Sequence, residues 1–337
     1  SKDEGSLTPL DEFLDQAAKT FSSGVREMAC RLDQCSTSFD KTAQTLGRLA
    51  SIDISGESVR QLVEHEGKQA ARLVRRGRID PGWDASDCVT DEGRTRVYVG
   101  CDGVKVPLVT DQEKRKRRAT IKGKRQRSGK RRRALPPPKQ GADESFKEFR
   151  VVTAYDQEQK RRTVAVTSGD CEQTGRLLRN MAIAIKLPDA DESIAIVDGA
   201  PWIRNQLELH QITDHILLDY FHLKDYAQRT RREVYGEESE EGRLWLVELT
   251  RQLLEEGVDE AWDGLAEWRK NLRGRRRKAA DRLLGYVAER RDMIRYRESR
   301  DHGWQIGSGP TEAQCKSTTL RLKGRGRRWD AANAQAI

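Results

Sequence analysis

Three acidic residues stand out by where they occur in the sequence. Asp102 ends the apolar stretch YVGCDG, Asp198 ends the apolar stretch AIVDGA, and Glu312 lies at the start of an expected helix, GPTEAQCK. Three carboxylates brought together repel one another unless they are protonated or bind a hard cation, and Mg²⁺ prefers oxygen ligands. The pattern therefore predicts a catalytic and metal-binding set of Asp102, Asp198 and Glu312. Two Mg²⁺ ions, or Mn²⁺ in their place, could promote phosphoryl transfer there.

Simpler interpretations of the same residues stay open. An Asp-Gly pair after a strand is often only a turn. Glu312 could form an ordinary ion pair with Lys316, four residues later on one helix face. A phosphate backbone as partner would instead explain the many bases that follow Glu312. These predicted DNA-binding residues are Lys316, Arg321, Lys323, Arg325, Arg327 and Arg328.

Five apolar stretches rich in β-branched residues predict the sheet that would position these acids. They span residues 95–110, 148–156, 161–168, 193–200 and 215–223, and the last is expected to become helical near Asp219. Helices are expected over 171–187, from about Pro201, over 224–300 and after the Gly-Ser-Gly-Pro stretch. Ligands bind at the carboxyl ends of strands in open α/β sheets, which is where Asp102 and Asp198 fall.

The N-terminal part is expected to be helical throughout. Residues 7–35 carry apolar positions at three- and four-residue spacing, which indicates one or two amphipathic helices. A helix before residue 51 is followed by a second after Ser55, a good N-cap residue, with Val59 facing inward. This pair fits a helix-turn-helix whose Arg60 and Gln61 could enter a major groove, although an ordinary helical hairpin would look the same.

The net charge of +9 is concentrated in one segment. Residues 114–139 contain 14 Lys or Arg and no acid, so the rest of the chain carries 9 − 14 = −5. Such a block is commonly a disordered loop that binds a polyanion. It could lie along DNA as a flexible arm, be a dispensable insertion, or serve only solubility.

The remaining composition excludes several classes of protein. The six cysteines show neither a C-x-x-C pair nor zinc spacing, so we expect free thiols in a reducing cytoplasm. There is no apolar run of about 20 residues and no signal-peptide pattern, so no membrane partner is expected. The chain begins at Ser1 without Met, which suggests a processed or tagged end.

Taken together, four motifs make the chain resemble the DDE transposases of bacterial insertion sequences. They are YVGCDGVKVPL, VDGAPWI, LLDYFHL and GSGPTEAQCK…RLKGRGRRW, within about residues 36–337. The resemblance is to the Kra-type branch related to the ISL3-like enzymes. It implies an α/β, ribonuclease-H-like catalytic core with a helical insertion, preceded by an all-α helix-turn-helix DNA-binding domain.

The resemblance also implies a domain arrangement. It comprises a helical DNA-binding domain at 1–77, a linker at 78–94, a core at 95–223 with a basic insertion at 111–147, a helical insertion at 224–303 and a final core segment at 304–337. Asp219 and His222 match the family's Asp-…-Phe-His motif, either as supports behind the metal ligands or as a simple core contact. The chain stops where family members usually continue, so Ile337 could mark a truncated gene.

The implied reaction is metal-dependent cleavage of transposon ends, followed by attack of the new 3′-hydroxyl on target DNA. A homodimer would pair two double-stranded ends, in the nucleoid-containing bacterial cytoplasm. Two other functions remain open at this point. One is a domesticated transposase that cuts or joins DNA for its host, and the other is a DNA-binding regulator with an inactive core.

Overall fold

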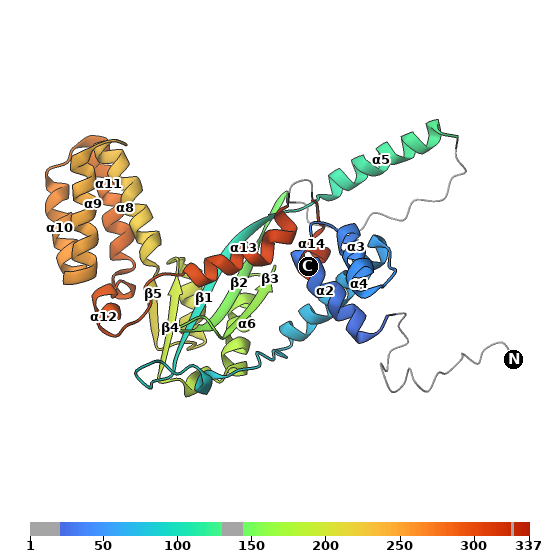
Figure 1. Ribbon diagram of the computed structural model, residues 1–337. Helices are drawn as coiled ribbons and strands as arrows, with labels where there is room; N and C mark the ends of the chain where they lie inside the picture. Colours follow the sequence, from blue (N-terminus) through green and yellow to red (C-terminus); the bar gives the residue numbers. More distant parts are fainter. Residues whose placement is uncertain (1–20, 130–143, 325–326) are drawn as a thin grey trace. The chain divides into compact units, whose positions relative to one another are not determined.

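The computed structural model describes residues 21–129, 144–324 and 327–337, and it is a mixed α/β protein (Figure 1). The chain divides into two compact units. The first consists of residues 1–76, 105–149 and 317–337, and the second of residues 77–104 and 150–316. The boundary passes through β1 (Arg96–Pro107), β2 (Phe146–Asp156) and α13 (Gly309–Lys323).

The five-stranded sheet has the order β3-β2-β1-β4-β5. Its other strands are β3 (Arg162–Thr167), β4 (Glu192–Val197) and β5 (His215–Leu218). β2 and β3 form an antiparallel pair, whereas β4 is parallel to both β1 and β5. Every residue of β4 is buried, as expected for a central parallel strand covered on both faces.

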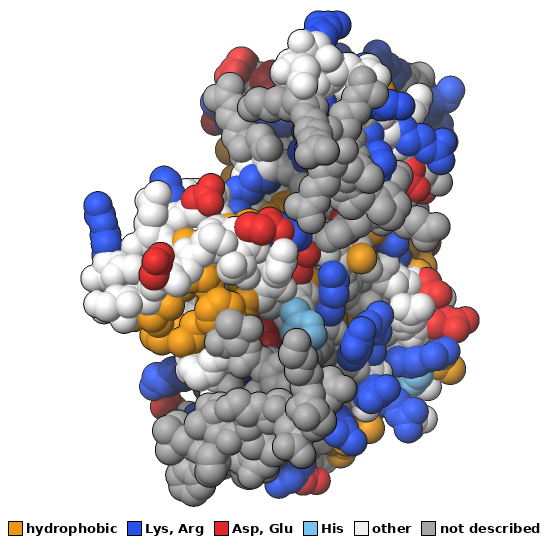
Figure 2. Space-filling view, turned by 90° about the vertical axis from the view of Figure 1, so that its right-hand side faces the viewer, with side chains coloured by type: hydrophobic (Ala, Val, Ile, Leu, Met, Phe, Trp, Pro, Cys, Tyr) orange, Lys and Arg blue, Asp and Glu red, His pale blue; other side chains and the backbone are white. Residues whose placement is uncertain are grey.

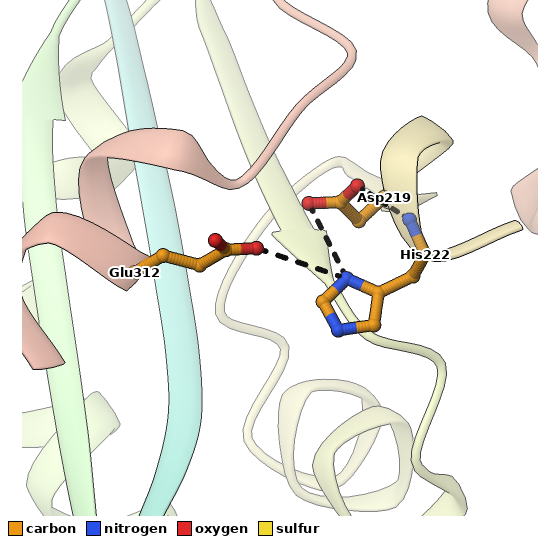
Figure 3. A group of neighbouring side chains, drawn as sticks. All are labelled: Asp219, His222 and Glu312. Carbon is orange, nitrogen blue, oxygen red and sulfur yellow. Dashed lines mark hydrogen bonds and ion pairs between the residues drawn. The ribbon is translucent and has the colours of Figure 1, made fainter. Parts of the chain in front are cut away.

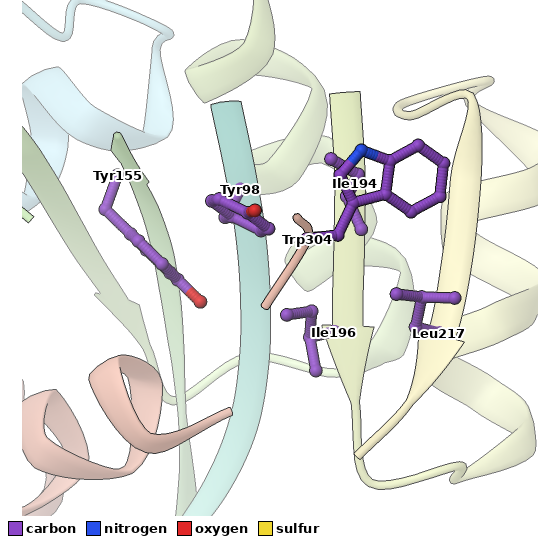
Figure 4. Packing of buried hydrophobic residues seen from close by; sticks show 6 residues of the cluster. All are labelled: Tyr98, Tyr155, Ile194, Ile196, Leu217 and Trp304. Carbon is purple, nitrogen blue, oxygen red and sulfur yellow. The ribbon is translucent and has the colours of Figure 1, made fainter. Parts of the chain in front are cut away.

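One face of this sheet holds an aromatic and aliphatic cluster (Figure 4). The rings of Tyr98 and Tyr155 stack with centroids 5.5 Å apart. The buried members of the cluster are Tyr98, Tyr155, Ile194, Ile196, Leu217 and Trp304. Gln305 donates its backbone N–H to the Tyr98 hydroxyl, which fixes the segment that leads into α13 against the sheet.

The second unit also contains most of the helices. α6 (Cys171–Ala184) and α7 (Pro201–Leu209) follow β3 and β4, and the remaining helices lie between β5 and α13. These are α8 (Tyr220–Tyr235), α9 (Glu240–Arg251), α10 (Val258–Lys270), α11 (Gly274–Ala288) and α12 (Tyr296–Asp301), with a π-helical turn at Gln252–Glu256. The partly buried rings of Tyr235, Trp245 and Trp268 pack together and connect α8, α9 and α10.

In the first unit, three N-terminal helices pack around one apolar cluster. They are α2 (Ser23–Cys35), α3 (Phe39–Ala50) and α4 (Gly56–Arg75). Ser38 and Ser55 cap α3 and α4, so the second cap is at the predicted position. Leu46, Val59 and Val63 are buried between the helices. The C-terminal α14 (Ala331–Ala336) packs so closely on α4 that a side chain at Gly67 would collide with the carbonyl of Ala336.

Much of the expected element order is confirmed. The five predicted strands are present, the predicted helices are found within the described residues, and β5 ends at Leu218, just before α8 begins. All six cysteines are free thiols. Of the helix predicted over 7–35, only the part from residue 21 lies within the described residues.

Three predictions of local structure differ from the structure. Asp102 was expected to end its strand, but β1 continues past it to Pro107. The basic segment was expected to be a loop, but Asp111–Arg127 form the helix α5, and residues 130–143 lie outside the described part. The segment 78–94, expected as a linker, packs into the second unit, because Ala85 and Cys88 are buried and Ala85 donates its N–H to the Ile185 carbonyl. Among the described residues, no helix is both long and apolar enough to cross a membrane.

Candidate active site

Three aspartates form one row across the parallel part of the sheet. Cys101 is paired with Val197, and Val197 is paired with Leu218. The residues that follow these three in the chain are Asp102, Asp198 and Asp219, of which only Asp102 still lies within its strand. Neighbouring strands lie about 4.8 Å apart, so the three aspartates lie side by side in adjacent segments, at the carboxyl ends of β4 and β5.

Alternation along each strand places these aspartates on the face that carries the aromatic cluster. Side chains two or four residues apart share a face, which relates Asp102 to Tyr98 and Asp198 to Ile196. The helix that carries Glu312 approaches this same face. A side chain at Gly100 would lie only 1.9 Å from the Thr311 hydroxyl, so the helix can approach only because residue 100 has none.

Asp219 is the most buried acid of the row, and its carboxylate is fully hydrogen-bonded. One oxygen accepts the backbone N–H groups of Phe221 (2.6 Å) and His222 (3.1 Å) and so caps α8. The other oxygen accepts the backbone N–H of Ser308 at 2.7 Å and also its hydroxyl. Burial opposes the charged form, but the bonds from His222 and Ser308 outweigh it and hold the pKa of Asp219 below its usual range.

Asp102 has a less complete set of partners. Its two oxygens accept the Gly103 N–H at 2.6 Å and the Cys315 thiol at 3.5 Å. Burial raises the pKa of the Asp102 carboxyl, and the nearby negative charge of Asp198 acts in the same direction. Asp198 is half-buried, and its side chain accepts the Ala200 N–H at 2.9 Å. Both carboxylates therefore retain free acceptor capacity beside one another.

Glu312 enters the cluster from α13, where it faces His222 (Figure 3). His222 Nδ1 lies 4.0 Å from a Glu312 oxygen and 3.6 Å from an Asp219 oxygen. The Asp219 carboxylate is the main reason that the pKa of His222 is raised to about 9, and the charges of Asp198 and Glu312 add to it. The imidazole therefore carries a positive charge at neutral pH, surrounded by acids.

The structure groups the candidate metal ligands differently from the prediction. Ligand atoms of Asp219, His222 and Glu312 all lie within 4.8 Å of one another, whereas Asp102 and Asp198 are outside that group. Because Asp219 already accepts four hydrogen bonds, we regard it as a support for the Ser308 segment. The carboxylates of Asp102, Asp198 and Glu312 each accept fewer hydrogen bonds and keep the acceptor capacity that a hard divalent cation would need. No ion pair joins the described Glu312 to Lys316.

One predicted DNA-binding residue, Arg321, was assigned wrongly. Its guanidinium forms two 3.1 Å bonds to Asp33, and the exposed fractions of the two side chains are 4% and 0%. It also lies over the rings of Phe39 and Trp329, with its central carbon 4.6 and 5.5 Å from their centroids. A buried, fully paired arginine of this kind stabilises the first unit and cannot reach a phosphate.

The other bases of this segment divide into two groups. Arg327 donates to the carbonyls of Leu320 and Arg321 at the end of α13, and Arg328 pairs with Glu113. Lys316 and Lys323 are exposed, as a phosphate contact requires. Arg325 lies outside the described residues.

Both predicted recognition residues lie in the first turns of α4. Arg60 forms ion pairs with Glu57 (2.5 Å) and Glu64 (2.7 Å), and Gln61 donates to Glu57 at 2.9 Å. Gln61 is exposed and Arg60 is half-buried. Binding of Arg60 to a nucleic acid would therefore have to compete with two internal ion pairs.

Sequence reasoning missed Ser308 and Cys315 as members of the site. Ser308 connects the segment before Glu312 to Asp219, and Cys315 connects α13 to Asp102. A signal was available for Cys315, because residues three apart share a helix face and Cys315 is three residues after Glu312. A scan of the chain against family models gives no match, and a search among curated proteins finds no significant relative.

Proposed function

We propose that this chain is a DDE-type transposase that cleaves the DNA ends of a mobile element and joins them to target DNA. The observation that carries the proposal is the placement of Asp102, Asp198 and Glu312 towards one face of the sheet. Two of them are neighbours in a strand register, and the third sits on a helix that approaches the same face. Because these acids come from segments far apart in the sequence, the arrangement is hard to attribute to turn formation.

The residues around these acids would position them for such chemistry. Asp219 holds the backbone and hydroxyl of Ser308, whose carbonyl accepts the N–H of Glu312 at 3.1 Å in the first turn of α13. Cys315 and the Gly103 N–H orient the two oxygens of Asp102. Two Mg²⁺ ions held by Asp102, Asp198 and Glu312 would supply Lewis-acid activation of the attacking and leaving oxygens.

The element order supports the finer fold assignment that belongs to this proposal. The long helical segment from α8 to α12 lies between the second and third acids, where the resemblance places a helical insertion in a ribonuclease-H-like core. The α3–α4 pair, with its tight connection and the exposed Gln61, would be the helix-turn-helix that binds transposon ends. A homodimer would bring two such ends together.

The direct test is cleavage of end-labelled duplexes taken from the DNA that flanks the gene, with Mg²⁺ or Mn²⁺. Asp102→Asn, Asp198→Asn and Glu312→Gln should each lower cleavage more than ~100-fold, because even residues behind a metal ligand contribute 10- to 100-fold. The matched control is Asp91→Asn, which removes an exposed acid of the same unit. Its cleavage rate should equal that of the unchanged protein.

A binding measurement separates this proposal from the regulator hypothesis. Mn²⁺ titration followed by electron paramagnetic resonance should show ions bound by the unchanged protein and by Asp91→Asn, with weakened binding in the three site variants. Specific binding of the flanking duplexes, without cleavage and without Mn²⁺ binding, would instead identify a DNA-binding protein with an inactive core.

A further inference from the structure

The helix α5 is a charged element that the proposed active site does not use. Nine of its 17 residues are Lys or Arg and only two are acidic, and none of its residues is buried. Among the described elements of its own unit, Figure 1 shows no helix or strand packed alongside it. Figure 2 shows a face on which many Lys and Arg side chains are exposed.

The first turn of α5 is attached to the rest of its unit. Thr110 caps the helix, and the preceding Val109 donates its N–H to the carbonyl of Trp329 at 2.8 Å. The acids are confined to this attached end, where Glu113 pairs with both Arg117 and Arg328. Beyond Glu113 there is no acid in the helix, so every charged residue in the part that extends from the attachment is basic.

This helix is expected to be weak by itself. Like charges four residues apart, such as Arg118 and Lys122, destabilise a helix by about 0.2–0.5 kcal/mol per pair. Gly123 in the interior costs about 1 kcal/mol relative to alanine. No apolar face compensates, because no side chain is buried. A polyanion would remove the repulsion that the helix cannot relieve alone.

The distribution of side chains selects the kind of polyanion. A membrane-surface helix needs a broad apolar face, and a partner helix needs apolar residues at heptad spacing, but α5 has only Ala119 and Ile121. A helix with its side chains is about 10–12 Å across, and 17 residues extend over about 25 Å. The major groove of duplex DNA is about 12 Å wide and is lined by phosphates on both sides.

We propose that α5 lies in the major groove of duplex DNA and neutralises phosphates on both walls of the groove. The proposal rests on the proposed function, which it deepens by assigning a second DNA contact, separate from the α3–α4 pair and from the acids. The contact requires no particular base sequence, because it depends on phosphates. It would hold flanking or target DNA.

The test measures binding of the full chain to a 30-base-pair duplex of arbitrary sequence, in EDTA, by fluorescence anisotropy at several salt concentrations. The variant Lys122→Gln/Lys124→Gln/Arg127→Gln removes three exposed charges and retains good helix formers. Losing three phosphate contacts should flatten the slope of log K against log salt by about 2.7. Affinity near 0.1 M salt should fall by roughly one to two orders of magnitude.

The matched control is Lys160→Gln/Arg176→Gln/Lys270→Gln, which removes three exposed bases that are already paired with acids. Its salt slope should change by less than about one. Because EDTA prevents cleavage, a failure of the proposed active site would leave this result unaffected.

Three outcomes would overturn the proposal. An unchanged salt slope in the α5 variant, with an unchanged melting temperature, would show that the helix does not bind phosphates of the duplex. Competition by netropsin, a minor-groove ligand, without competition by methyl green, a major-groove ligand, would place the contact in the other groove. A larger loss of binding to single-stranded RNA or to phosphatidylserine vesicles than to the duplex would assign α5 to that partner.

Discussion

The two ends of α13 use charged residues in opposite ways. At its start, Glu312 has a 42% exposed side chain, and its nearest partners are long contacts, 3.4 Å from the Ser308 hydroxyl and 4.0 Å from His222. Near its other end, Arg321 is buried and held by Asp33 and two aromatic rings. The Glu312 carboxylate therefore retains the capacity to bind a ligand, whereas the interactions of the Arg321 guanidinium stabilise the fold.

The same distinction separates the aspartates of the sheet. Asp219 accepts four hydrogen bonds and is fully buried, whereas Asp102 accepts two and Asp198 one, so both of these keep acceptor capacity. Residue type and position along a strand do not reveal this difference. The number of partners already satisfied is therefore a better guide to function than the presence of a charge.

The largest expected effect comes from removing the buried ion pair between Arg321 and Asp33 near the C-terminal end of α13. Arg321→Met leaves Asp33 charged and buried without its partner, which typically costs about 3–5 kcal/mol. The first unit should unfold at lower urea concentration, as followed by the fluorescence of Trp329. The double variant Asp33→Leu/Arg321→Met should recover most of the loss, and equal stability of the single and double variants would contradict this account.

A second comparison sets Asp219→Asn against Glu312→Gln. Loss of charge-assisted hydrogen bonds should make Asp219→Asn less stable by about 1.5–3 kcal/mol. Glu312→Gln should change the free energy of unfolding by less than about 0.5 kcal/mol, because the side chain is exposed and weakly bonded. Thermal and urea unfolding measure both, and comparable losses would show that the two acids are equally structural.

A substitution of Cys315 tests how the residues around the proposed metal ligands support them. Cys315→Ala removes the thiol that donates to Asp102, and Mn²⁺ affinity should fall about tenfold, the lower end of the range for residues that orient metal ligands. Cys315→Ser keeps a donor and should restore part of that affinity. If alanine and serine behave alike, the thiol only fills space.

The smallest effect concerns His222, which is partly exposed. Its folded pKa of about 9 lies above the ordinary histidine value of 6.5, so the stability it contributes is fully present below about pH 6.5. That contribution is lost as the pH rises through about 9. An NMR titration of metal-free protein should show the raised value, and Asp219→Asn should lower it towards 6.5. If the pKa of His222 stays near 9 in that variant, Asp219 is not the cause of the raised value.

Part of this architecture could be predicted from local patterns. Apolar stretches of β-branched residues predicted five strands, and Ser55 marked the start of α4, because caps and strand periodicity depend on neighbouring residues. The helix α5 was missed for a related reason. Its bases show no periodicity, so the charge of the segment favoured a loop, although Lys and Arg are good helix formers.

The candidate site required more than local patterns. The sequence by itself determined that Asp198 follows a strand and that Glu312 opens a helix, since these positions follow from the residues around them. It did not determine the position of Asp102, which lies inside β1 and not at its end. Only the tertiary structure decided that Asp219 lies beside these residues and accepts hydrogen bonds from Ser308. It also decided that Arg321 is buried and paired with Asp33, 288 residues away. Strand register and burial depend on contacts between distant segments, and the same charged residue can bind a ligand or complete a core according to those contacts.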